Sequence, residues 1–304
     1  MHSNVKPSVA SHFPSLSKGP DIDPNIHMFT EDIHLAIMPI GGRIEKQVDF
    51  TVKFQGEEPD CEKAKAIIGE LGEFDRYDTA AMVCDAVDNI ARHLAWKGQA
   101  VYEIIKDNDQ IYIHGFTPKN LIKIILWYLQ IIPPGDWDLW KRKYTFINKK
   151  RIWEVKMPRE LGGISEYKRI LRKLRKYDHL GPSFYRKDLE RGEALKNYDF
   201  LKYARNSEIY FNRITHKWGW NRRDSSQEKC TEFYSFYKML SFKWAQAVLR
   251  EHIINEINQL LFRLSIKCKV VVSGLPTSEE ILQVRSDMQK GLISFSEVSN
   301  KVAM

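Results

Sequence analysis

The stretch that decides the fold class is residues 79–105, TAAMVCDAVDNIARHLAWKGQAVYEII. Its apolar residues from Ala80 to Leu94 recur three and four positions apart, which is the period of an amphipathic helix. Gly98 ends this helix, and the residues after it alternate as in a β-strand. A second alternating run at 110–114 follows a short polar turn. The sequence therefore predicts a helix followed directly by a β-hairpin, which indicates an α+β protein.

Similar patterns extend in both directions from this stretch. Toward the N-terminus, alternation within 43–54 predicts a strand, and 61–71 reads as a helix. Toward the C-terminus, apolar residues at helical spacing predict one long helix from about Phe233 to Ser265, then a strand at 269–272. Two capping boxes, Thr277-Ser-Glu-Glu280 and Ser294-Phe-Ser-Glu297, each predict the start of a short helix. The expected fold is mixed β-hairpins and helices with a long helix in the C-terminal third.

The middle of the chain is harder to interpret. The apolar run 121–132 fits a buried strand or a short helix equally well. Residues 144–147 and 151–156, on either side of a turn at 148–150, predict a second hairpin. An amphipathic helix is predicted for 165–177.

Four segments follow from these patterns. Because residues 1–40 begin with a stretch rich in Ser and Pro, we expect them to form a flexible N-terminal arm. Residues 41–180 form the α+β body, and 181–232, which are polar and aromatic with weak periodicity, are expected to be an irregular insertion. Residues 233–304 hold the long helix, the strand and the two short helices.

Basic residues concentrate in one part of the chain. The 304 residues contain 47 Lys or Arg and 39 Asp or Glu, and residues 141–176, the basic window, hold fourteen of the former against three Glu. Such a density predicts contact with nucleic-acid phosphates, although a solvated amphipathic surface has the same composition. The expected nucleic-acid contacts are Lys141, Arg142, Lys143, Lys149, Lys150, Arg151, Arg169, Arg172, Lys173 and Lys176.

A catalytic interpretation centres on Glu154 and Lys156. Residues two apart on a strand share a side, so Glu154 and an upstream carboxylate, Asp136 or Asp138, would together hold Mg²⁺ beside the lysine. The spacing resembles the D…(D/E)xK pattern of the restriction-endonuclease-like superfamily. A Mg²⁺-dependent nuclease is therefore one alternative function, and a solvated strand face is the structural alternative.

Other function classes lack their signatures. The four cysteines form no CxxC pair, so neither a zinc ribbon nor a disulfide framework is predicted, and we expect reduced thiols. The N-terminus has no signal-peptide pattern, and Lys123 interrupts the longest apolar run, which is too short to span a membrane. There is no P-loop, GxSxG or HExxH motif, and outside the nuclease interpretation no cofactor is predicted.

Three pieces of the sequence, taken in order, resemble portal proteins of tailed bacteriophages. The first is LAWKGQAVYEII (94–105) with the hairpin after it and FTPKNL (116–121). The second runs from Tyr144 to Leu161, includes RIWEVKMP (151–158) and is followed by Gly162 and Gly163. The third comprises IINEINQLL (253–261), VVV (270–272) and KGLISFSE (290–297).

This resemblance implies a non-catalytic structural subunit of a ring, typically dodecameric, at one capsid vertex. The ring would be assembled in the host cytoplasm and belong to the virion, and DNA would be packaged and ejected through it. The implied partners are further copies of the chain, double-stranded DNA, the packaging terminase, and capsid or connector proteins, with no membrane. The basic window would contact the passing DNA. A non-enzymatic nucleic-acid adaptor, monomeric or dimeric, is a third interpretation that requires only the basic window.

Overall fold

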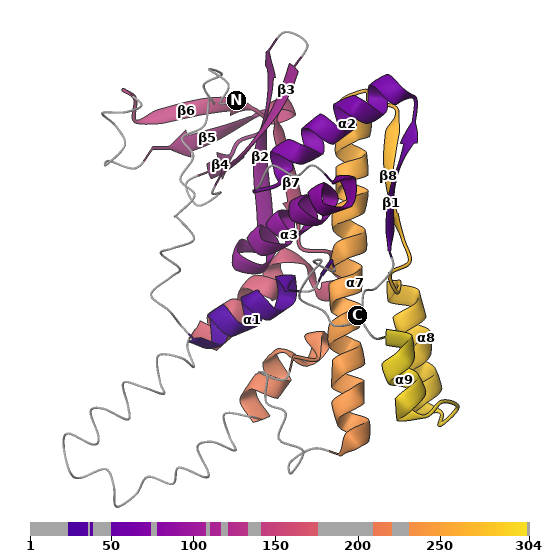
Figure 1. Cartoon of the computed structure of the whole chain (residues 1–304). Coiled ribbons are helices and arrows are strands. Elements are labelled where there is room, and N and C mark those ends of the chain that lie inside the picture. The colour runs from indigo at the N-terminus through magenta and orange to yellow at the C-terminus, as the bar shows by residue number, and fades with distance from the viewer. Residues whose placement is uncertain are drawn as a thin grey trace, which may run out of the picture. The chain divides into compact units, whose positions relative to one another are not determined.

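A computed structural model of the chain contains both helices and antiparallel strands (Figure 1). This confirms the predicted α+β class, and the long C-terminal helix is α7 (Glu232–Arg263). The chain divides into two compact units, each built from segments distant in sequence. The residues that the structure describes are 24–35, 37–38, 50–73, 78–107, 110–116, 121–132, 141–175, 209–220 and 231–302.

Unit 1 comprises Met1–Gly19, Met38–Lys156 and His252–Gly274, and therefore includes the last part of α7. Its described strands form three small antiparallel sheets with the orders β1-β8, β3-β2-β7 and β4-β5-β6. The elements of unit 1 are β1 (Thr51–Gly56), α2 (Glu58–Leu71), α3 (Thr79–Lys97), β2 (Gln99–Asp107), β3 (Gln110–Phe116), β4 (Leu121–Lys123), β5 (Trp127–Ile131), β6 (Tyr144–Asn148), the 3₁₀ turn η3 (Lys149–Arg151), β7 (Ile152–Lys156) and β8 (Cys268–Ser273).

The helix and hairpin predicted from residues 79–105 are confirmed. The carboxylate of Asp78 accepts a hydrogen bond from the amide of Ala81 at 2.8 Å, which caps the start of α3. Gly98 follows the helix with φ of 73°, and its amide donates to the carbonyl of Leu94 at 2.7 Å. β2 then pairs with β3 in antiparallel register, with Glu103 opposite His114.

The prediction of a second hairpin over residues 144–156 is wrong. β6 pairs with β5, whereas β7 pairs with β2, so the two strands belong to different sheets. The chain passes from one sheet to the other through η3, where the side chain of Asn148 accepts from the amide of Lys150 at 2.9 Å. The guanidinium of Arg263 donates to the carbonyls of Lys150 and Ile152, which holds this turn against the end of α7. The ambiguous run 121–132 forms the two strands β4 and β5.

The β1-β8 ladder joins two segments from opposite ends of the chain, as Figure 1 shows. Its neighbour α2 brings the sulfurs of Cys61 and Cys268 to 3.2 Å without a disulfide. The side chain of Asn258 in α7 pairs with both the amide and the carbonyl of Val270 in β8. These bonds make α2, α7 and β8 one packed group within unit 1.

His93 in α3 makes the stability of unit 1 sensitive to pH. Burial lowers its pKa to about 4, with help from the charges of Arg92 and Lys97, while the backbone of Asn89 and the carboxylate of Glu73 act in the opposite direction. The unfolded chain therefore binds more protons between about pH 6.5 and pH 4. We expect the free energy of unfolding to fall by about 3 kcal/mol as the pH decreases through this window.

Urea unfolding at a series of pH values tests this expectation. The His93→Gln variant lacks the titrating group and should lose this part of the pH dependence. An unchanged slope in the variant would assign the acid sensitivity to other side chains.

Unit 2 comprises Pro20–Ile37, Met157–Glu251 and Leu275–Met304. Its described elements are helical, and the predicted helix at 165–177 is present at 163–175. Both predicted capping boxes are formed, by Thr277 with Glu280 and by Ser294 with Glu297. The elements of unit 2 are α1 (Pro24–His34), η4 (Arg159–Leu161), the helices 163–175 and 209–214, η6 (His216–Trp218), the first part of α7, α8 (Ser278–Gln289) and α9 (Phe295–Val302).

The prediction of a flexible arm is wrong for residues 24–34, which form the helix α1. The ring of Phe29 packs against the rings of Tyr167, Trp218 and Trp220, with centroids 5.0 to 6.2 Å apart. The indole of Trp220 also donates to the carboxylate of Asp32 at 2.7 Å. A fully buried aromatic ring thus makes this segment part of the unit 2 core. Within the expected irregular insertion 181–232, residues 209–214 form a helix and His216–Trp218 form η6, so the described middle of this segment has regular structure. The other expectations for the arm and the insertion fall on residues 1–23, 36, 39–40, 181–208 and 221–230, outside the described part of the chain.

Candidate nucleic-acid interface

The basic window is divided between the two units. Residues 141–156 belong to unit 1, where the first three precede β6 and Lys149–Arg151 form η3. The described residues from 157 to 175 belong to unit 2, and Lys176 lies outside the described residues. The lysines and arginines of both parts are exposed. The sequence thus predicts one basic segment, and the structure assigns its residues to two different units.

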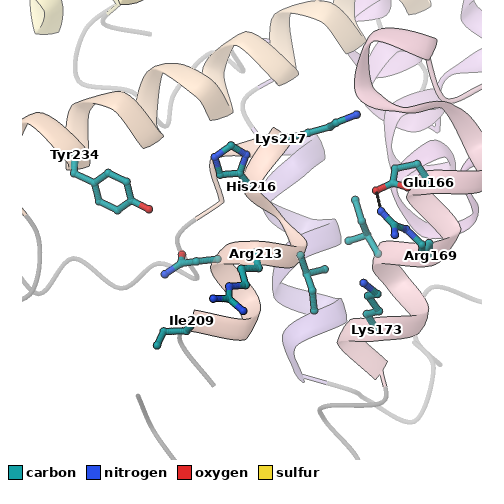
Figure 2. Close-up of a pocket in the computed structure, with 11 residues that line it drawn as sticks. Glu166, Arg169, Lys173, Ile209, Arg213, His216, Lys217 and Tyr234 are labelled. Carbon is teal, nitrogen blue, oxygen red and sulfur yellow. Dashed lines mark hydrogen bonds and ion pairs between the residues drawn. The ribbon is translucent and has the colours of Figure 1, made fainter. Parts of the chain in front are cut away.

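The part in unit 2 lines a cavity of about 560 Å³. Arg169 and Lys173 are four residues apart on the helix 163–175, so they project from the same face. Figure 2 shows these two residues on one wall of the cavity. Arg213, His216 and Lys217 belong to a different segment, which forms a second wall. The full lining is Glu166, Arg169, Ile170, Lys173, Ile209, Asn212, Arg213, Ile214, His216, Lys217 and Tyr234.

This cavity, the cationic pocket, has four cationic side chains against one carboxylate. The carboxylate, Glu166, pairs with Arg169 at 2.5 Å. The hydrogen bond from Arg169 lowers the pKa of Glu166 below its usual value, and the charges of Arg169, Lys217 and Lys173 add to this effect, while burial acts in the opposite direction. The side chains of Arg169, Lys173 and Lys217 therefore all act on the carboxylate of Glu166. Such an arrangement favours a ligand with several negative charges, such as consecutive phosphates.

The second wall of the pocket is positioned by packing in unit 2. The hydroxyl of Thr215 donates to the carbonyl of Phe211 at 2.8 Å, and the indole of Trp218 is fully buried. Gly219 follows with φ of 66°, and a Cβ at this position would lie 2.4 Å from the carbonyl oxygen of Lys238 in α7. The backbone at residue 219 lies so close to α7 that only glycine fits there. This contact holds the turn that carries His216 and Lys217 against α7.

The predicted contacts of the helix 163–175 do not all meet in the pocket. Arg169 and Lys173 line it, whereas Arg172 does not, and its Nε donates to the carbonyl of Lys168 at 3.4 Å. Sequence reasoning missed Arg213 and Lys217, because both lie in the segment of weak periodicity. Their positive charge was the one sign in the sequence that they could bind phosphate. Only the tertiary structure shows that they lie near the helix 163–175.

Glu154 and Lys156 lie together in unit 1, as alternation along a strand predicts. The carboxylate of Glu154 is 3.1 Å from the ammonium of Lys156 and 3.8 Å from that of Lys123. It borders a second cavity, of about 670 Å³. Asp136 and Asp138, the other carboxylates of the nuclease interpretation, lie outside the described residues. Within the described part of the chain, no three His, Cys, Asp or Glu side chains are grouped as in a metal site.

Comparison with known proteins leaves the family open. No protein-family model matches the sequence, and no curated protein matches it. Among the described helices, none combines the length and the apolar character of a membrane span. The resemblance to portal proteins therefore stays a prediction.

Proposed function

We propose that the protein is a non-catalytic structural subunit of a portal-type ring that contacts double-stranded DNA as the DNA is packaged and ejected. The cationic pocket of unit 2 is the observation that carries this proposal. Its four basic side chains, Arg169, Lys173, Arg213 and Lys217, suit phosphate oxygens. Phosphate contacts hold DNA without reading its sequence, as a channel for passing DNA requires.

The order of elements supports the same proposal. The first piece of the resemblance corresponds to α3, Gly98 and the β2-β3 hairpin, and the second to β6, η3 and β7. The third corresponds to the end of α7, β8, α8 and α9. The proposed setting is the capsid vertex of a virion, with the packaging terminase and capsid or connector proteins as further partners.

The native mass tests the proposal, measured by light scattering after gel filtration, with negative-stain images of the same fractions. We expect rings of roughly a dozen subunits with closed symmetry. Monomers or dimers at every concentration, together with salt-sensitive DNA binding, would replace the ring with the adaptor function. Mg²⁺-dependent cleavage of DNA that is lost in Glu154→Ala would replace it with the nuclease.

A further inference from the structure

Cys61 and Cys268 bring two sulfur atoms together inside unit 1. The sulfurs are 3.2 Å apart, and the thiol of Cys268 donates to the sulfur of Cys61. Both residues are buried, at 8 and 7% exposed, and both are reduced. They are 207 positions apart in the sequence, so only the tertiary structure makes them neighbours.

Hydrogen bonds that involve neither sulfur hold the two cysteines in place. In the first turn of α2, the amide of Cys61 donates to the carbonyl of Glu57 at 2.9 Å. The carboxylate of Asp60 accepts from the amide of Lys267 at 3.0 Å, so the residues that directly precede the two cysteines are themselves joined. A reaction of the thiols need not break any of these bonds.

The strand β8, which starts with Cys268, is also held from the side of β1. In the β1-β8 ladder, Cys268 lies opposite Gly56. A Cβ at Gly56 would collide with the carbonyl oxygen of Lys267 and lie 3.3 Å from the Cβ of Cys268. The absence of a side chain at Gly56 therefore allows the end of β1 to approach the start of β8 closely.

Two thiols at this separation need little movement to form a disulfide. An S–S bond is about 2.05 Å long, so two sulfurs at 3.2 Å have to approach by roughly 1 Å. Rotation of the side chains about their Cα–Cβ bonds moves the sulfurs by this much while the backbone stays where it is. The pair is therefore a dithiol that can be oxidised in place.

Burial controls how fast this dithiol reacts. Burial raises the pKa of the Cys268 thiol to about 12; the hydrogen bond and charge of Cys61 and the charge of Asp60 act in the same direction, while the backbone of Lys269 opposes them. The thiolate is the reactive form of cysteine, so this thiol is scarcely ionised near pH 7. We expect oxidation to be slow and to require an oxidant small enough to reach a buried sulfur.

We propose that Cys61 and Cys268 are a site of reversible oxidation, at which a peroxide joins α2 to β8 through a disulfide. One sulfur attacks an oxygen of hydrogen peroxide, the O–O bond breaks, and a sulfenic acid and one water form. The second sulfur attacks the sulfur of the sulfenic acid, the S–O bond breaks, and the disulfide and a second water form. The two thiols lose two electrons and two protons, and the peroxide is reduced to two waters.

The disulfide connects two parts of unit 1 that are separate in the chain. Cys61 lies in the segment Met38–Lys156 and Cys268 in the segment His252–Gly274, and the residues between these segments belong to unit 2. A cross-link that closes so long a loop strongly restricts the unfolded chain, so oxidation should stabilise unit 1. This inference goes beyond the proposed function and does not depend on the ring or on DNA.

Peptide mapping of the folded wild-type chain by mass spectrometry tests the proposal. The chain is treated with hydrogen peroxide at pH 8.5, where more of each thiol is ionised than at pH 7. We expect the peptides of Cys61 and Cys268 to be linked, with a mass two hydrogens below their sum, and dithiothreitol to separate them. Circular dichroism should show a melting temperature about 5–10 °C higher in the oxidised chain.

Two alanine variants distinguish this pair from cysteine oxidation in general. Cys61→Ala removes one member, and peroxide should then no longer raise the melting temperature. Cys84→Ala is the matched control, because Cys84 in α3 is also buried and burial raises the pKa of its thiol to about 12. This variant should show the same rise in melting temperature as wild type.

Three results would overturn the inference. The first is sulfinic acid at Cys61 or Cys268 without a linked peptide, and the second is a link from either residue to Cys84 or Cys230. The third is a linked peptide in a chain whose melting temperature does not rise, which would remove the stabilising role. Because the peptide map uses the wild-type chain, it decides the matter even if Cys61→Ala fails to fold.

Discussion

Alanine replacement of the four cationic residues of the unit 2 pocket, Arg169, Lys173, Arg213 and Lys217, is expected to weaken binding to double-stranded DNA by about 100-fold at low salt. Each phosphate contact contributes about −0.9 to the slope of log affinity against log salt, so losing four contacts makes the slope shallower by up to about 3.6. Fluorescence anisotropy of a labelled duplex across a series of NaCl concentrations measures both quantities. The loss should be the same for duplexes of different sequence, because phosphates carry no base information.

The matched control removes other basic residues from the same helix. Lys168→Ala, Arg172→Ala and Arg175→Ala change side chains outside the pocket lining. This triple variant should retain most of the affinity. If it binds DNA as weakly as the pocket variant, general charge and not the pocket is responsible for binding.

Trp218→Ala is expected to lower the free energy of unfolding of unit 2 by about 3–5 kcal/mol. The side chain is fully buried, and its ring packs against those of Phe29 and Tyr167 at 5.7 and 5.6 Å between centroids. Removing it leaves a cavity at the point where α1, the helix 163–175 and η6 meet. Because η6 carries His216 and Lys217, DNA binding should weaken in parallel.

Denaturant unfolding monitored by circular dichroism measures this loss. Trp127→Ala removes the same side chain from the exposed face of β5, where Trp127 is 44% exposed, and should cost about 1 kcal/mol or less. Equal losses for the two variants would show that Trp218 does not anchor the unit 2 core.

One wall of the cationic pocket can be predicted from the sequence, and the other cannot. Lys173 and Arg169 could be selected as contacts from charge density and helical spacing alone. Nothing in the local pattern around Arg213 or Lys217 points to the same pocket, because their proximity to the helix 163–175 depends on the burial of Trp218. The weak periodicity of that segment concealed a wall of the site.

The sequence by itself determined the features that are encoded within a few residues. α3 and its caps, the β2-β3 hairpin, α7 and the two capping boxes depend on periodicity and on hydrogen bonds between near neighbours, so one short segment contains the necessary information. Only the tertiary structure decided that β6 and β7 belong to different sheets, that α1 joins the core of unit 2, and that β1 pairs with β8. Those outcomes depend on contacts between segments far apart in the chain, where the gain from burial and strand pairing exceeds local preference.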